Sequence, residues 1–88
     1  SIIENNSTEG YYETYYENGL ANGPYKQYFR NGQIETEGHY KKGLKTGLWI
    51  KYYVNGQLKR EGHYEKDFKI GLWKTYYHDG QLQSEGNY

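Results

Sequence analysis

The chain has 88 residues, 11 basic and 11 acidic side chains, and no cysteine. This length predicts one domain with a small core, and the lack of cysteine excludes disulfide bonds and thiolate metal sites. Zero formal charge argues against nucleic-acid binding, which needs a basic patch, and against strong attraction to anionic lipid. Because the chain holds 13 Tyr and 2 Trp, we expect aromatic rings to supply most buried contacts.

A period of 24 residues runs through the chain, as in Tyr16, Tyr40, Tyr64 and Tyr88. Self-similarity at a fixed period indicates a repeat architecture, which builds extended surfaces and not catalytic pockets. We divide one repeat domain, residues 1–88, into a faint partial repeat (1–22), two full repeats (23–46 and 47–70) and a partial repeat (71–88). Residues 1–6 follow no repeat and are expected to be frayed. Because the chain stops within a repeat, we expect it to be a piece of a longer array.

Each repeat contains a hairpin signal. In the middle repeat, two strand-prone runs, 48–54 and 57–64, flank Asn55-Gly56. Asn-Gly favours a two-residue type I′ turn, in which both central residues have positive φ. Asn31-Gly32 and Asp79-Gly80 take the same place in the other repeats. The connection between hairpins is predicted to be longer (41–46 and 65–70), with an apolar residue tucked under it: Leu20, Leu44 or Phe68. The chain is therefore predicted to be an all-β antiparallel meander of hairpins.

Side chains alternate between the two faces of a strand, so a two-residue turn defines the face of each residue. In the middle repeat this turn pairs Trp49 with Gly62 and Tyr53 with Leu58. The residues on the resulting apolar face are Tyr25, Phe29, Ile34, Gly38 and Tyr40, then Trp49, Tyr53, Leu58, Gly62 and Tyr64, then Trp73, Tyr77, Leu82, Gly86 and Tyr88. We expect each Trp ring to lie across its partner glycine, and we assign structural roles to Trp49, Trp73, Gly38, Gly62, Gly86, Tyr40 and Tyr64. The polar pair Lys51 and Arg60 also falls on this apolar face, and the sequence pattern gives no reason for it.

The opposite face is polar but rich in tyrosine, and it is the predicted partner surface. Its residues are Tyr28, Tyr52, Tyr76, Glu37, Glu61, Glu85, His39 and His63. Tyrosine suits recognition because it offers a large contact area at low entropic cost. The alternative is that these rings only stiffen a thin sheet, and that the glutamates bond tyrosine hydroxyls or lysines on neighbouring strands.

No catalytic, metal or cofactor site is predicted. His39 and His63 lie two strands apart, roughly 9.6 Å, whereas one zinc ion binds histidine nitrogens at about 2.1 Å. No Ser-His-Asp or Cys-His set can be argued from the chain, and no glycine-rich phosphate loop is present. We therefore predict that the protein is not an enzyme.

The unit G-x-W-x-x-Y-Y-x-N-G-x-L-x-x-E-G-x-Y resembles a MORN-type repeat, and most closely its bacterial variant, over about residues 10–88. Asp67-Phe68 and Pro24-Tyr25 depart from the pattern without breaking its frame. The resemblance implies a single-layer, elongated, twisted antiparallel sheet that serves in binding or scaffolding. It also implies kinship with bacterial antitoxin-like and surface-associated repeat proteins.

The leading hypothesis is a non-enzymatic module for protein–protein interaction or scaffolding, with an unidentified protein partner. A carbohydrate- or cell-wall-binding role is the alternative, because GLW-x-x-YY-x-[ND]-G is similar to choline- and glucan-binding repeats. Those repeats lack the EG-x-Y half found here, so this role ranks lower. A lipid-surface role, suggested by the MORN name alone, ranks third. Self-association through exposed strand edges is also predicted. Whether the protein is exported, surface-bound or cytoplasmic stays open.

Overall fold

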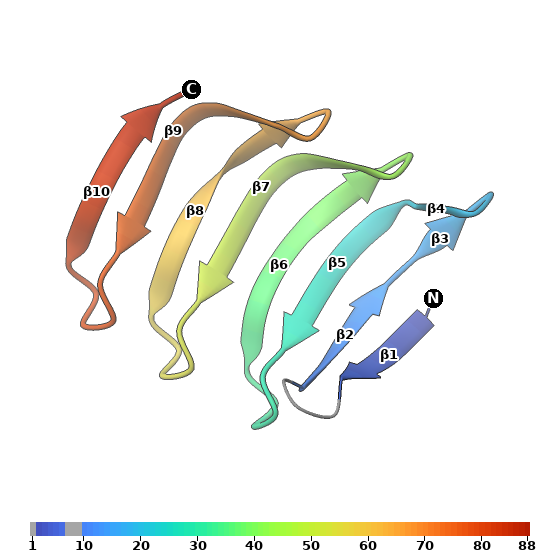
Figure 1. Cartoon of the computed structure of the whole chain (residues 1–88), viewed down its shortest axis with the longest axis horizontal. Coiled ribbons are helices and arrows are strands. Elements are labelled where there is room, and N and C mark those ends of the chain that lie inside the picture. The colour runs from blue at the N-terminus through green and yellow to red at the C-terminus, as the bar shows by residue number, and fades with distance from the viewer. Residues whose placement is uncertain (1, 7–9) are drawn as a thin grey trace.

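A computed structural model of the chain describes residues 2–6 and 10–88, and these residues form ten strands and no helix (Figure 1). The strands are β1 (Ile2–Asn6), β2 (Gly10–Thr14), β3 (Tyr16–Glu17), β4 (Leu20–Ala21), β5 (Gly23–Tyr28), β6 (Ile34–Lys41), β7 (Leu44–Tyr52), β8 (Leu58–Glu65), β9 (Phe68–Tyr76) and β10 (Leu82–Asn87). Eight of them form one sheet in the order β1-β2-β5-β6-β7-β8-β9-β10, and β3 pairs with β4 in a short ribbon. All neighbours are antiparallel.

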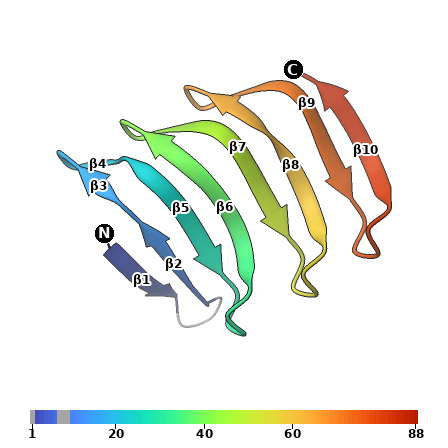
Figure 2. The ribbon, with the colours of Figure 1, turned by 180° about the vertical axis from the view of Figure 1, so that it is seen from behind.

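The sheet is a single open layer that measures 40 × 31 × 15 Å. Figure 2 shows that no described element covers its other side. The predicted all-β, single-layer meander of stacked hairpins is therefore confirmed. Within the described ranges, the chain has no helix long and apolar enough to cross a membrane. Because one layer stands alone, both faces are available to solvent or to a partner.

The Asn-Gly turns differ from the predicted type I′ geometry. Gly56 has a φ of 88°, but Asn55 does not have a positive φ. The Tyr53 N–H donates to the Gln57 carbonyl at 2.8 Å, and the Gly56 N–H donates to the Tyr53 carbonyl at 2.9 Å, which closes a three-residue loop. Asn55 acts through its side chain, because its Oδ1 accepts the Gln57 N–H at 2.9 Å. Asp79 makes the same bond in the last hairpin, which explains why Asn and Asp both serve at this position.

The type I′ turns lie instead in the connections between hairpins, which were predicted to be longer. Lys42-Gly43 has φ values of 51° and 83°, and Lys41 pairs directly with Leu44. Asn18-Gly19 and Lys66-Asp67 have the same pair of positive φ values. A two-residue turn leaves no room for a side chain beneath it. The apolar residues expected there are exposed, at 50% for Leu20, 39% for Leu44 and 73% for Phe68.

A β-bulge in each hairpin changes the predicted register near the Asn-Gly turn. The middle hairpin keeps the predicted pairing up to Lys51, but Tyr52 then pairs with Leu58 because Lys59 is an extra residue. The predicted pairing of Tyr53 with Leu58 is therefore wrong. Paired residues share a face, so Leu58 lies with Tyr52 and not with the tryptophans. The same shift moves Ile34 and Leu82 off the predicted apolar face.

The core of the protein is a row of rings on one side of the sheet, which we call the aromatic face. The row contains Tyr25, Tyr40, Trp49, Tyr64, Trp73 and Tyr88, with neighbouring ring centres 5.0 to 6.3 Å apart. Most contacts are edge-to-face, the geometry that aromatic pairs prefer. Trp49 and Trp73 are each only 6% exposed. Ring contacts within and between hairpins thus replace the second layer on which a sheet normally packs.

Each Trp ring covers a glycine, but not the predicted one. Trp49 pairs with Gly62, yet its ring lies on Gly38 of the preceding hairpin, where a Cβ atom would overlap the indole. Trp73 lies in the same way on Gly62. Both indole N–H groups also donate to a backbone carbonyl of the preceding strand, at 3.2 and 3.1 Å. Each tryptophan therefore ties two hairpins together, which a ring lying over its own hairpin would not do.

Candidate functional site

The register places the predicted partner-surface residues on the side of the sheet opposite the tryptophans. We call this side the tyrosine–glutamate face, and its predicted members are Tyr28, Tyr52, Tyr76, Glu37, Glu61, Glu85, His39 and His63. Within each hairpin the alternation holds because the bulge lies next to the Asn-Gly turn. Between hairpins the register shifts again, at Glu37/His39 and Glu61/His63, but these residues stay on the same face. The structure therefore gathers these residues as columns across adjacent hairpins.

Tyrosine hydroxyls on this face bond glutamates of the preceding hairpin. Tyr52 donates to Glu37 Oε1 at 3.2 Å, and Tyr76 donates to Glu61 Oε1 at 3.3 Å. This is one of the two contacts that the sequence predicted for the glutamates. Burial raises the pKa of Tyr52, and the charge and hydrogen bond of Glu37 raise that pKa further. These effects favour the protonated hydroxyl, which is the form that donates the hydrogen bond to Glu37.

Aliphatic side chains are exposed among these polar residues. Leu48 and Leu72 are each 45% exposed, Ile70 is 38% exposed and Leu82 is 49% exposed. Leu48 and Ile70 both pair with His63, so they lie in one row across the sheet. Sequence reasoning assigned Leu82 to the other face and did not single out Leu48, Ile70 or Leu72, although Leu48 and Leu72 recur at the 24-residue step directly before each tryptophan. The predicted polar face is therefore partly apolar.

His39 and His63 belong to the tyrosine–glutamate face without forming a metal site. They are exposed on β6 and β8, with β7 between them. In the part of the chain that the structure describes, no three His, Cys, Asp or Glu side chains gather closely enough to hold a metal ion. We therefore interpret His39 and His63 as surface residues of this face.

On the aromatic face, lysine side chains cover the rings. Lys45 Nζ lies 5.0 Å from the ring centre of Trp49 and 4.9 Å from that of Tyr64. Lys69 repeats both contacts one hairpin later, at 4.9 and 5.1 Å. A cation over an aromatic ring is attracted by the negative ring face. These contacts stabilise the row of rings and cover the surface that a stacking ligand would need.

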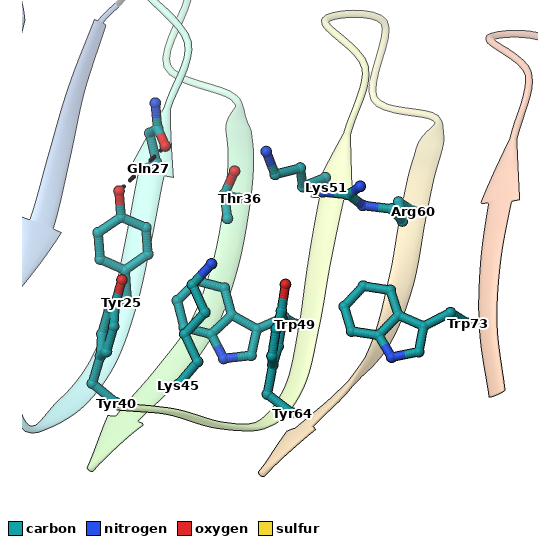
Figure 3. A pocket seen from close by; sticks show the side chains of 10 residues that line it. All are labelled: Tyr25, Gln27, Thr36, Tyr40, Lys45, Trp49, Lys51, Arg60, Tyr64 and Trp73. Atoms are coloured by element: carbon teal, nitrogen blue, oxygen red, sulfur yellow. Dashed lines mark hydrogen bonds between the residues drawn. The ribbon is translucent and has the colours of Figure 1, made fainter. Parts of the chain in front are cut away.

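Beside the row of rings, the aromatic face is hollowed by a cavity of about 170 Å³ (Figure 3). Rings line one side of this hollow, and Gln27, Thr36, Lys51 and Arg60 line the other. At its edge the Tyr25 hydroxyl donates to Gln27 Oε1 at 3.2 Å. Burial raises the pKa of Tyr25 to about 12, with smaller contributions from neighbouring tyrosines and a glutamate. The hollow therefore combines apolar walls with cationic and hydroxyl donors.

An open sheet of stacked hairpins with two accessible faces defines a repeat protein of the interaction class, in which an extended surface meets the partner. The chain belongs to the MORN repeat variant family, whose model matches residues 21–42, 45–66 and 69–88, more than half of the chain. MORN repeats are in general non-catalytic modules for interaction with proteins or membranes. No curated protein and no solved structure matches the chain.

Proposed function

We propose that the chain is a protein-binding module whose tyrosine–glutamate face receives the partner. The observation that carries this proposal is the exposure of Leu48, Ile70 and Leu72, at 38 to 45%, among the tyrosines of that face. Burying apolar surface is the main favourable term in protein association. Contiguous apolar patches on soluble proteins are a mark of interaction sites, and tyrosine is a favoured residue at such sites.

The charges of the face narrow the partner's chemistry. Glu37 and Glu61 both pair with Ile50, and on their other sides Glu37 pairs with Lys26 and Glu61 with Lys74. The face therefore carries acidic and basic side chains in alternation around an aliphatic one. A segment with apolar side chains flanked by charged residues of both signs would match this pattern. A scaffolding role would use the same surface.

The carbohydrate-binding alternative receives less support from the contacts. Sugar rings stack on exposed aromatic faces, but Trp49 and Trp73 are 6% exposed and lie under lysine side chains. No observation on the described residues favours the lipid-surface alternative over a protein partner. Both remain outcomes that a binding experiment would reveal.

Affinity capture followed by direct titration tests the proposal. We expect the chain to retain a protein that a Leu48→Lys/Leu72→Lys variant no longer retains. Val54→Lys is the matched control, because Val54 is 60% exposed at an Asn-Gly turn, away from the face. The captured protein is then purified and titrated against all three chains by calorimetry. Equal affinity for the face variant and the control would rule out the tyrosine–glutamate face.

Self-association is a second candidate, favoured by the geometry of β10. Every residue of β10 is exposed. Gly86 occupies the position of the ring-covered glycines of the other hairpins, but no atom lies within 4 Å of where its Cβ would be. An open strand edge can pair with another copy. We expect light scattering to show dimers or longer stacks whose proportion rises with concentration. A strict monomer at high concentration would refute this candidate.

A further inference from the structure

A row of polar side chains crosses the aromatic face beside the row of rings. Ladder pairing joins its members in order from β5 to β10: Gln27, Thr36, Lys51, Arg60, Thr75 and Ser84. Each of these side chains can donate a hydrogen bond, and none is acidic. We call this the donor row. Strands lie about 4.8 Å apart, so six of them give the row a length of roughly 24 Å.

Two cations stand opposite each other at the centre of the donor row. Lys51 and Arg60 form a cross-strand pair, an arrangement in which like charges destabilise a sheet. In the described part of the chain, no ion pair joins either side chain to a carboxylate. Arg60 instead lies 5.9 Å from the ring centre of Trp73. The pair is therefore a local excess of positive charge on a chain of zero formal charge.

The surroundings of Lys51 disfavour the charged form of its side chain. Burial is the largest cause that lowers the pKa of Lys51, and the neighbouring cations Arg60 and Lys59 lower it further. Glu35 acts in the opposite direction, but its effect is smaller. An anion held at this place would reverse the balance, because an opposite charge nearby favours the charged form of a lysine.

The donor row also contains a buried hydroxyl group that has no partner. Thr36 is 4% exposed, and its Oγ1 makes no hydrogen bond in the described structure. Buried polar groups are nearly always paired, so each exception asks for an explanation. Thr36 pairs with Lys51 and lines the same hollow, and Figure 3 shows Thr36, Lys51 and Arg60 along one side of it. A donor and two cations thus converge on one small volume.

We propose that the donor row binds carboxylate groups of an acidic protein segment, with Thr36, Lys51 and Arg60 at its centre. A carboxylate can accept two parallel bonds from an arginine and further bonds from a lysine and a hydroxyl. The adjacent rings would contact the aliphatic part of an Asp or Glu side chain. The length of the row matches roughly seven residues of extended chain.

Two observations favour a peptide over a larger polyanion. The formal charge of zero gives no long-range attraction toward a nucleic acid or an anionic membrane. The hollow of about 170 Å³ lies at mid-strand, where single side chains can enter it. This face lies opposite the tyrosine–glutamate face, so the proposal stands or falls separately from the proposed function.

Tryptophan fluorescence gives a direct measure of binding, because the only two tryptophans, Trp49 and Trp73, both line the hollow. The probe is hexaglutamate with blocked termini, titrated at low salt. We expect a saturable change in fluorescence that weakens as salt is added. Lys51→Gln/Arg60→Gln should weaken binding about tenfold or more. The control Lys26→Gln/Arg30→Gln removes the same charges away from the donor row and should leave the affinity nearly unchanged.

Measurements on the variants without peptide show whether a substitution weakens binding or only destabilises the fold. Without peptide, Lys51→Gln/Arg60→Gln should melt at the same or a higher temperature, because the cross-strand repulsion is gone. Thr36→Val keeps the shape of the side chain and removes the unpaired hydroxyl. It should fold as well as the parent chain and bind hexaglutamate more weakly. This second variant keeps the test decisive if the double variant does not fold.

Three comparison ligands define the outcomes that overturn the proposal. If hexaglutamine binds as tightly as hexaglutamate, the donor row does not recognise carboxylate groups. If glutarate binds as tightly as hexaglutamate, a small dicarboxylate is sufficient and the ligand is not a protein segment. Phosphatidylserine vesicles that bind more tightly, through Lys51 and Arg60, would assign the row to a lipid surface. The proposal also fails if hexaglutamate does not bind, or binds Lys51→Gln/Arg60→Gln as well as the parent chain.

Discussion

The indole ring of Trp73 lies on Gly62 of the preceding hairpin, at a distance that leaves no room for a Cβ atom. Trp49 lies on Gly38 in the same way, one repeat earlier. Gly86 occupies the third equivalent position, but nothing lies within 4 Å of where its Cβ would be. None of the three has a positive φ, so backbone strain does not distinguish them. The requirement for glycine is therefore steric, and it depends on the tryptophan of the next hairpin.

Gly62→Ala should therefore destabilise the sheet, whereas Gly86→Ala should not. Forcing an extra methyl group against a packed ring costs about 1–3 kcal/mol. For a domain of this size, each 1 kcal/mol lowers the melting temperature by about 4–8 °C. Thermal unfolding followed by circular dichroism measures both variants. Equal losses at the two positions would show that the Trp73 contact is not the cause.

The left-handed residues of the inter-hairpin turns supply a stabilising prediction. Lys42 has a φ of 51°, a conformation that Asn and Gly adopt more readily than a long side chain. Lys42→Asn creates Asn-Gly in a true type I′ turn and should add about 0.5–1 kcal/mol to the free energy of unfolding. Urea unfolding gives the comparison. Lys41→Asn, at the strand residue next to it, is the control and should bring no gain.

Asn55 should respond in the opposite way, because it acts through its side-chain oxygen. Asn55→Gly removes both the acceptor of the Gln57 N–H and the Nδ2 donor to the His78 carbonyl, and should cost about 1–2 kcal/mol. Asn55→Asp keeps the acceptor and loses only the donor to His78. A type I′ turn would instead tolerate glycine well at this position. Urea unfolding of the two variants therefore distinguishes the turn types, and a stable Asn55→Gly chain would support type I′.

The contrast between these turns shows what local sequence can and cannot predict. Asn-Gly is compatible with a type I′ turn and with a three-residue loop in which Asn bonds the backbone two residues later. The dipeptide alone does not choose between them. The extra residue Lys59 follows from the longer loop, and it moves Leu58 to the other face. The repeat, the hairpins and the pairing of Trp49 with Gly62 were all predictable, because they depend on period and alternation.

Contacts between hairpins were harder to predict than contacts within one. The hydrogen bond from Tyr52 to Glu37 was anticipated because both residues recur with the repeat. The position of Trp49 over Gly38 was not, since pairing within a hairpin says nothing about which neighbour a ring covers. For the candidate sites, sequence reasoning found the tyrosine and glutamate columns. It missed the exposed Leu48, whose burial depends on whether a second layer is present.

The raised pKa of Tyr25, about 12 against 10.0 in an unfolded chain, predicts a loss of stability at high pH. Burial is its largest cause, because the surrounding protein removes part of the water that would stabilise the ionised hydroxyl. Below pH 10 the tyrosine is neutral in both states and has no effect. Between pH 10 and 12 the unfolded chain ionises first, so the stability present below pH 10 is lost as pH rises.

Because Tyr25 is only partly buried, we expect this loss to be on the order of 1–2 kcal/mol once screening by solvent is included. Urea unfolding of the parent chain and of Tyr25→Phe, at pH ~9 and pH ~11.5, isolates the effect. Tyr25→Phe should start less stable, having lost the hydrogen bond to Gln27, and should then lose less on the change of pH. Effects of high pH on the rest of the protein are shared by the two chains and cancel in the comparison. Equal losses in the two chains would mean that the Tyr25 hydroxyl is open to water and that burial does not raise its pKa.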